Sequence, residues 1–165
     1  PRGLKIKKII TADEMFNEVK KSLPVDLAVC AAAVTDFKPA KKTKNKIKKE
    51  TMKLNQINLI QNNDILEYIS KNNKHRPRLV AGFSAETENL LKNSISKINR
   101  KHCDLIFAND VSQKDIGFNS DYNKVSVISK NGDIKIIKKN KKSFIANKIA
   151  EILLDKLLIN DKNIN

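Results

Sequence analysis

What the sequence lacks excludes several classes of protein. No run approaches the ~18 consecutive apolar residues of a membrane-spanning helix, so we expect no membrane partner. The opening residues, PRGLKIKKII, contain no apolar core of a signal peptide. Cysteine occurs only at Cys30 and Cys103, each inside an apolar run, which argues against a disulfide framework or a cysteine metal site. Buried, reduced thiols suit a cytoplasmic protein, and that location is our expectation.

Aromatic residues and arginine are also scarce. The chain has no tryptophan, and its net charge of +15 comes mainly from lysine. Nucleic-acid readers favour the forked guanidinium of arginine and use aromatic rings to stack on bases. Lysine, asparagine and isoleucine are abundant together and share AT-rich codons, so codon bias explains the charge without any partner. A basic nucleic-acid-binding domain is therefore only a minor alternative.

The residues that are present alternate between apolar and amphipathic segments. Three nearly continuous apolar runs are typical of strands covered on both faces, and they span residues 26–34, 78–86 and 103–111. Three amphipathic segments predict helices, one before the first run at residues 11–23 and one in each gap between the runs, at residues 62–72 and 87–102. The first of these helices begins with a capping box formed by Thr11 and Glu14. Residues 4–10 alternate enough to predict one more short strand.

The last part of the chain predicts a hairpin and a helix. Asn131-Gly132 is a strong turn signal between the strands of residues 124–139. An amphipathic helix over residues 141–160 follows, with fraying after Leu158 and a tail at 159–165. The whole pattern predicts one domain over residues 1–165. We expect an α/β fold, with a Rossmann-like, mostly parallel sheet, flanking helices and an added β-hairpin.

In such folds, ligands bind beyond the carboxyl ends of the strands. Asp36 follows the first apolar run and can hold a metal ion or a ribose hydroxyl, although an Asx turn explains it equally well. The lysines of residues 38–49 can neutralise a polyphosphate or form a solvated loop. Lys97 and Lys101 are four residues apart and share one helix face, where complementarity to the helix dipole is the alternative reading. The residues alone therefore indicate an α/β domain that binds an anionic ligand.

Six segments in register resemble the phosphopantothenoylcysteine synthetase domain. They read AAAVTDFKP, NKIKK, NNDIL, LVAGFSAET, DLIFANDVS and GFNSDYNKV, and the resemblance extends from about Lys5 to about Leu158. It implies a phosphopantothenate–cysteine ligase of coenzyme A biosynthesis that uses CTP with Mg²⁺. The implied reaction joins 4'-phosphopantothenate to L-cysteine through an acyl-cytidylate intermediate and yields 4'-phosphopantothenoylcysteine.

The resemblance also implies a role for particular residues. Lys46 matches the catalytic lysine, Asp36 the metal-site aspartate, and Asn109 lies near the substrate rim. The region 117–137 matches the part through which these domains form homodimers. The positions that match CTP contacts are Ala32, Ala33, Asp36, Lys46, Asn63, Asp64, Ile65, Leu66, Phe83, Lys97 and Lys101.

Two departures from the family pattern define the alternatives. Family members often have proline where this chain has Asn63, which is itself a good helix N-cap. The glycine- and serine-rich segment that opens the family's domain has no counterpart here, so we expect a synthetase domain without its N-terminal segment. FMN would be a cofactor only if a decarboxylase half precedes the chain. A non-catalytic nucleotide-binding or dimerisation fragment is thus the main alternative.

Overall fold

The computed structural model describes residues 3–41, 56–112 and 120–162, which form two compact units. The smaller unit comprises residues 1–21 and 33–64, and the larger comprises residues 22–32 and 65–165. The prediction of a single domain stays a prediction.

The smaller unit contains nearly all of one helix and a two-stranded ribbon. Helix α1 (Ala12–Ser22) begins with the predicted capping box, because the Glu14 backbone N–H donates to Thr11 Oγ1 at 3.2 Å. In return, Glu14 Oε2 accepts from the backbone N–H of Thr11 at 3.2 Å. Strands β2 (Phe37–Pro39) and β3 (Leu59–Gln61) pair antiparallel, with Phe37 opposite Gln61.

The strand predicted for residues 4–10 is not formed. The described part of this segment has no helix or strand, and no strand of the described sheets lies beyond β1 (Leu27–Cys30) to pair with it. An alternating pattern fits a strand only where a neighbouring strand supplies the ladder of hydrogen bonds. The prediction of a strand over residues 4–10 was therefore wrong, because the segment pairs with no described strand.

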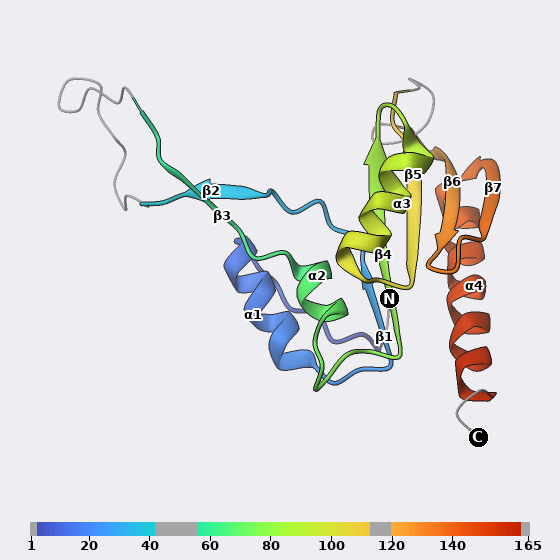
Figure 1. Ribbon diagram of the computed structural model, residues 1–165, viewed down its shortest axis with the longest axis horizontal. Helices are drawn as coiled ribbons and strands as arrows, with labels where there is room; N and C mark the ends of the chain where they lie inside the picture. Colours follow the sequence, from blue (N-terminus) through green and yellow to red (C-terminus); the bar gives the residue numbers. More distant parts are fainter. Residues whose placement is uncertain (1–2, 42–55, 113–119, 163–165) are drawn as a thin grey trace. The chain divides into compact units, whose positions relative to one another are not determined.

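The larger unit contains a five-stranded mixed sheet (Figure 1). Its order is β1, β4 (Leu79–Glu86), β5 (Leu105–Asp110), β6 (Tyr122–Ser129) and β7 (Ile134–Lys141). Strands β1, β4 and β5 run parallel, whereas β6 and β7 are the predicted hairpin and pair antiparallel. The α/β fold and the hairpin are confirmed. The sheet is mixed rather than mostly parallel, because the hairpin joins it as two full strands.

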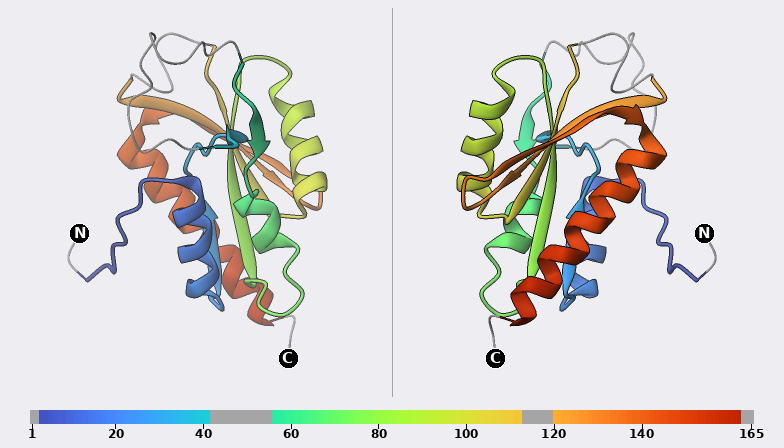
Figure 2. Two further views of the ribbon diagram at one scale, coloured as in Figure 1. Left: turned by 90° about the vertical axis from the view of Figure 1, so that its left-hand side faces the viewer. Right: turned by 90° about the vertical axis from the view of Figure 1, so that its right-hand side faces the viewer.

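Helices cover both faces of this sheet. Helix α4 (Lys142–Lys162) lies on one face, and α2 (Ile65–Ser70) with α3 (Leu90–Lys101) lies on the other (Figure 2). The sequence predicts fraying after Leu158, whereas α4 continues to Lys162. The α4 face holds a buried cluster of Leu79, Ala81, Leu105, Phe107, Val125, Val127, Ile137, Ile145, Ile149 and Leu153. Burial on both faces explains why β4 and β5 read as continuous apolar runs.

The amino ends of β4 and β5 are fixed by Arg76. Its Nη2 lies 2.9 Å from both carboxylate oxygens of Asp104, and its Nε donates to the Ser70 carbonyl at 2.9 Å. Asp104 Oδ2 also accepts from the backbone N–H of Val80 at 2.7 Å. One guanidinium therefore ties the end of α2 to the starts of two strands.

Among the described residues, no helix is both long enough and apolar enough to span a membrane. Cys30 and Cys103 are not joined in a disulfide. Cys103 is fully buried, and burial raises the pKa of its thiol to about 12. The prediction of a buried, reduced thiol is confirmed for this residue, whereas Cys30 is half-buried.

Gly82 allows α2 to pack closely on β4. A Cβ at this position would lie 2.5 Å from Leu66 Cδ2 and 3.2 Å from Ile106 Cδ1. We therefore expect Gly82→Ala to lower the free energy of unfolding by about 1–3 kcal/mol, since overpacking forces neighbouring side chains from their rotamers. Denaturant melts measure this. The double variant with Leu66→Ala is the control, and purely additive losses in the double variant would contradict the proposed clash.

Candidate functional site

The carboxyl ends of β1, β4 and β5 lie at one edge of the larger unit's sheet. Parallel pairing aligns them, with Cys30 opposite Gly82 and Glu86 opposite Asp110. Polar side chains follow where the strands end, as expected for a ligand site in an α/β fold. Ala32, which the resemblance matches to a CTP contact, is exposed shortly after β1.

Lys97 reaches this edge from α3. Its ammonium group donates to the Phe83 carbonyl at 3.1 Å and to Ser84 Oγ at 3.4 Å. An ammonium group has three N–H donors, so these two contacts orient the group without using all of its hydrogen-bonding capacity. The result is a positive charge held at the carboxyl half of β4.

A small polar network beside Lys97 was not predicted. Ser84 is buried, and its hydroxyl donates to Glu86 Oε1 at 2.5 Å. Glu86 Oε2 accepts from Asn93 Nδ2 at 3.0 Å, which connects β4 to α3. The available signal was a serine inside an otherwise apolar strand, because a buried hydroxyl requires a polar partner.

Lys101 lies on the same face of α3 but has a different partner. Its Nζ is 2.9 Å from Glu67 Oε2 on α2, and the residue is 9% exposed. Glu67 Oε1 accepts from Lys71 at 2.6 Å. These hydrogen bonds, first from Lys71 and then from Lys101, lower the pKa of Glu67 to about 2. Lys101 can therefore bind another anion only by sharing its ammonium group with Glu67 or by leaving it.

The remaining predicted residues of the larger unit differ in their surroundings. Phe83 directs its ring to the α4 face, where it lies 5.2 Å from the ring of Phe107, so only its backbone meets Lys97. Asn109 is half-buried and follows the buried part of β5, and its Oδ1 has no hydrogen-bond partner in the described residues. Ile65 and Leu66 are buried in the first turn of α2. Their side chains pack in the core, which leaves their backbone groups for any ligand.

The other predicted residues belong to the smaller unit or lie outside the described residues. Ala33, Asp36 and Asn63 are exposed, and Asp64 is half-buried. Lys46 lies outside the described residues, so its role stays a prediction. The described residues contain no cluster of three or more His, Cys, Asp or Glu that could hold a metal ion. A single exposed carboxylate such as Asp36 fits Mg²⁺ that retains waters and phosphate oxygens as its other ligands.

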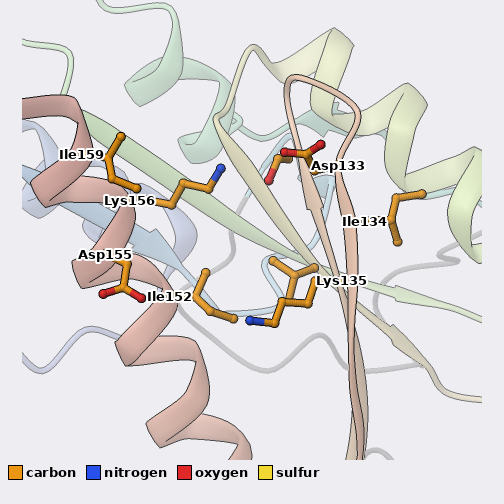
Figure 3. Close-up of a pocket in the computed structure, with 9 residues that line it drawn as sticks. Asp133, Ile134, Lys135, Ile152, Asp155, Lys156 and Ile159 are labelled. Atoms are coloured by element: carbon orange, nitrogen blue, oxygen red, sulfur yellow. The ribbon is translucent and has the colours of Figure 1, made fainter. Parts of the chain in front are cut away.

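A groove of about 230 Å³ lies elsewhere in the larger unit (Figure 3). It is bounded by the β6–β7 hairpin and by α4, and includes Ser129, Lys135, Ile152 and Lys156. Ser129 pairs with Leu105 at the start of β5, so the groove lies toward the amino ends of the parallel strands. None of the predicted site residues lines it.

The region predicted for dimerisation, residues 117–137, includes β6 and the first half of β7 within its described part. Strand β7 ends the sheet order, and its Ile134 and Ile136 are exposed. The homodimer stays a prediction.

Comparisons with known proteins point to one family. Residues 1–157 match the family model described as the DNA/pantothenate metabolism flavoprotein C-terminal domain. The coenzyme A biosynthesis bifunctional protein CoaBC of Borreliella burgdorferi is 38% identical over 155 residues, which cover 93% of this chain. The chain spans only 38% of the length of that protein.

Two solved structures share the fold. A crystal structure of the C-terminal domain of a CoaBC protein matches with a TM-score of 0.74 and 23% identity, over 98% of this chain and 69% of that one. A variant of Cab2 in complex with phosphopantothenate-cysteine matches with a TM-score of 0.52 and 20% identity, over 79% of this chain and 44% of that one.

The ion pairs of Glu67 with Lys71 and Lys101 make stability depend on pH. The folded pKa of Glu67 is about 2, below its ordinary value of 4.5, so this stabilisation is present above pH 4.5 and is lost as the pH falls toward 2. We expect Glu67→Gln to lower the melting temperature at pH 7, and the difference from the unsubstituted protein to shrink as the pH falls below 4.5.

Thermal melts between pH 2.5 and 7 test this prediction. Glu151→Gln is the matched control, because Glu151 and Lys148 form an exposed pair that contributes little. Melting curves for Glu67→Gln that stay a constant interval below those of the unsubstituted protein at every pH would rule out the ion pairs as the cause.

Proposed function

Because the chain belongs to the DNA/pantothenate metabolism flavoprotein C-terminal domain family, the phosphopantothenoylcysteine synthetase domain of coenzyme A biosynthesis, we propose that it ligates 4'-phosphopantothenate to L-cysteine with CTP. The family match over residues 1–157 carries this proposal. The Cab2 variant that shares the fold was solved with phosphopantothenate-cysteine, and that compound is the product proposed here.

In the proposed first step, a carboxylate oxygen of 4'-phosphopantothenate attacks the α-phosphorus of CTP. The bond between the α-phosphorus and the bridging oxygen breaks, and pyrophosphate leaves with that electron pair. Negative charge grows on the phosphate oxygens, so fixed positive charges lower the barrier most if they are oriented in advance. We assign this role to Lys46 and to Lys97, whose ammonium group the Phe83 carbonyl already orients.

In the proposed second step, the amine of L-cysteine attacks the acyl carbon of the acyl-cytidylate. The bond between that carbon and the phosphate oxygen breaks, CMP leaves, and the nitrogen loses a proton to give the amide. Mg²⁺ bound with CTP would neutralise charge on the triphosphate oxygens during the first step. Asp36 is the carboxylate that we assign to hold it, and Asn109 lies on the substrate rim. Ala32, Ala33, Asn63, Asp64 and the backbone of Ile65 and Leu66 are the proposed nucleotide contacts.

A non-catalytic nucleotide-binding module is the second candidate, because the chain spans 38% of the length of its Borreliella relative. Product analysis separates the two functions. A ligase releases pyrophosphate only when 4'-phosphopantothenate is present, and releases CMP at full rate only when L-cysteine is added as well. A binding module binds CTP but releases neither pyrophosphate nor CMP. That result would contradict the ligase assignment.

Lys46 provides the sharpest mutational test of the ligase. We expect Lys46→Gln in the full-length protein to lower kcat on the order of 10²-fold or more, since one charge-stabilising donor is lost from the transition state. The melting temperature should not change. Lys41→Gln is the control, because Lys41 is an exposed lysine of the same tract and should keep normal turnover. Equal kcat values for the two variants would remove Lys46 from the mechanism.

A further inference from the structure

Asn62 binds the Thr35–Asp36 dipeptide through both its side chain and its backbone. Its Nδ2 donates to the Thr35 carbonyl at 2.8 Å and approaches Thr35 Oγ1 at 3.4 Å. Its backbone N–H donates to the Asp36 carbonyl at 2.8 Å. All of these residues belong to the smaller unit. One residue therefore makes three hydrogen bonds to a dipeptide that lies 27 positions earlier in the chain.

These bonds continue the β2–β3 ladder beyond its last strand pair. Phe37 is opposite Gln61, and the next rung is the bond from the Asn62 backbone to Asp36. Beyond it, the amide side chain of Asn62 takes the place of a backbone donor and bonds Thr35. The chain can then leave the β2–β3 ladder at Asn63 and Asp64 while the hydrogen bond to Thr35 is kept.

The amide of Asn62 can adopt only one orientation. Because Nδ2 faces a carbonyl oxygen, a flipped amide would set two acceptors against each other. Asn62 is 8% exposed, and its Oδ1 is buried with no hydrogen-bond partner in the described residues. A buried, unsatisfied oxygen destabilises the fold. The bond from Nδ2 to the Thr35 carbonyl thus fixes the direction of the Asn62 side chain.

We propose that Asn62 is a positioning residue for the nucleotide. It fixes the backbone that carries the exposed Asp36 carboxylate against the Asn63–Asp64 segment, so that both meet the same CTP. This inference rests on the proposed function, in which Asp36 and Asn63–Asp64 are CTP contacts. Asn62 itself touches neither CTP nor the reacting atoms. A shift of about 1 Å in a positioning group can lower the rate on the order of 10²-fold. Loss of the hydrogen bonds from Asn62 should therefore have a measurable effect.

Steady-state kinetics of the full-length protein test this role. We expect Asn62→Ala to raise the KM for CTP by about tenfold or more and to raise the Mg²⁺ concentration for half-maximal rate, with an unchanged KM for L-cysteine. A tenfold change corresponds to about 1.4 kcal/mol of lost binding. Asn62→Asp, which has the same shape but no amide donor, should give the same result if the alanine variant folds poorly.

Two controls separate positioning from general damage. Asn58→Ala removes an exposed amide from the same unit, and Thr35→Val removes only the longer contact. Both should keep the KM for CTP within about twofold of the unsubstituted value, far below a tenfold effect. A structural role alone would lower the melting temperature and the active fraction, and hence kcat, without raising that KM.

The outcomes also separate this inference from the proposed function. If the unsubstituted protein shows no CTP-dependent turnover, the proposed function fails and the role of Asn62 fails with it. If the unsubstituted protein turns over and both Asn62 variants keep its KM for CTP and its Mg²⁺ requirement, only the positioning role of Asn62 is overturned.

Discussion

The larger unit depends on the parallel alignment of β4 with β1 and β5. This alignment sets the carboxyl ends of three strands at one edge, with Glu86 opposite Asp110. Both faces of β4 must then be covered, and Gly82 leaves the space in which Leu66 of α2 fits. At the opposite edge, Arg76 and Asp104 tie the strand starts together. The strands whose carboxyl ends lie beside Lys97 are therefore held by pairing along their length and by Arg76 and Asp104 at their amino ends.

The local rules of the sequence predicted most of the elements. The capping box of Thr11 and Glu14 formed as expected, because both partners lie within one helical turn. Asn131-Gly132 produced the hairpin, with Gly132 at a φ of 92° that favours glycine. The second and third apolar runs became β4 and β5, which helices cover on both faces as inferred. The first run was expected to be covered in the same way, but it formed only the short strand β1 at the end of the sheet, where Val29 is exposed. Each of these features depends on residues that are close in sequence.

What the sequence could not predict depends on long-range partners. Residues 4–10 have a strand pattern, but they pair with no described strand. The pairing of Lys101 with Glu67 joins residues 34 positions apart, and no local pattern indicates it. Phe83 was expected in the nucleotide pocket, yet strand alternation turns its ring to the Phe107 side of the sheet. Asn62 was not predicted either, because its hydrogen bond to Thr35 forms only when β2 and β3 pair.

The lysines illustrate how position selects function in a chain of net charge +15. Lys38 pairs with Asp13, and Lys101 pairs with Glu67, so their charges are compensated within the protein. Lys97 instead bonds a backbone carbonyl and a hydroxyl, which orient it without neutralising it. A charge that is oriented but not neutralised is the kind that stabilises an incoming polyphosphate.

The central claim is that this chain uses CTP, and a comparison of nucleotides tests it most directly. Melting temperatures would be measured with CTP, ATP and GTP at equal concentrations, each with Mg²⁺. A ligand that binds only the folded state raises the melting temperature by an amount that grows with its affinity. The account predicts a clear rise with CTP that exceeds the rise with either purine nucleotide. No rise with CTP, or equal rises with all three, would contradict it.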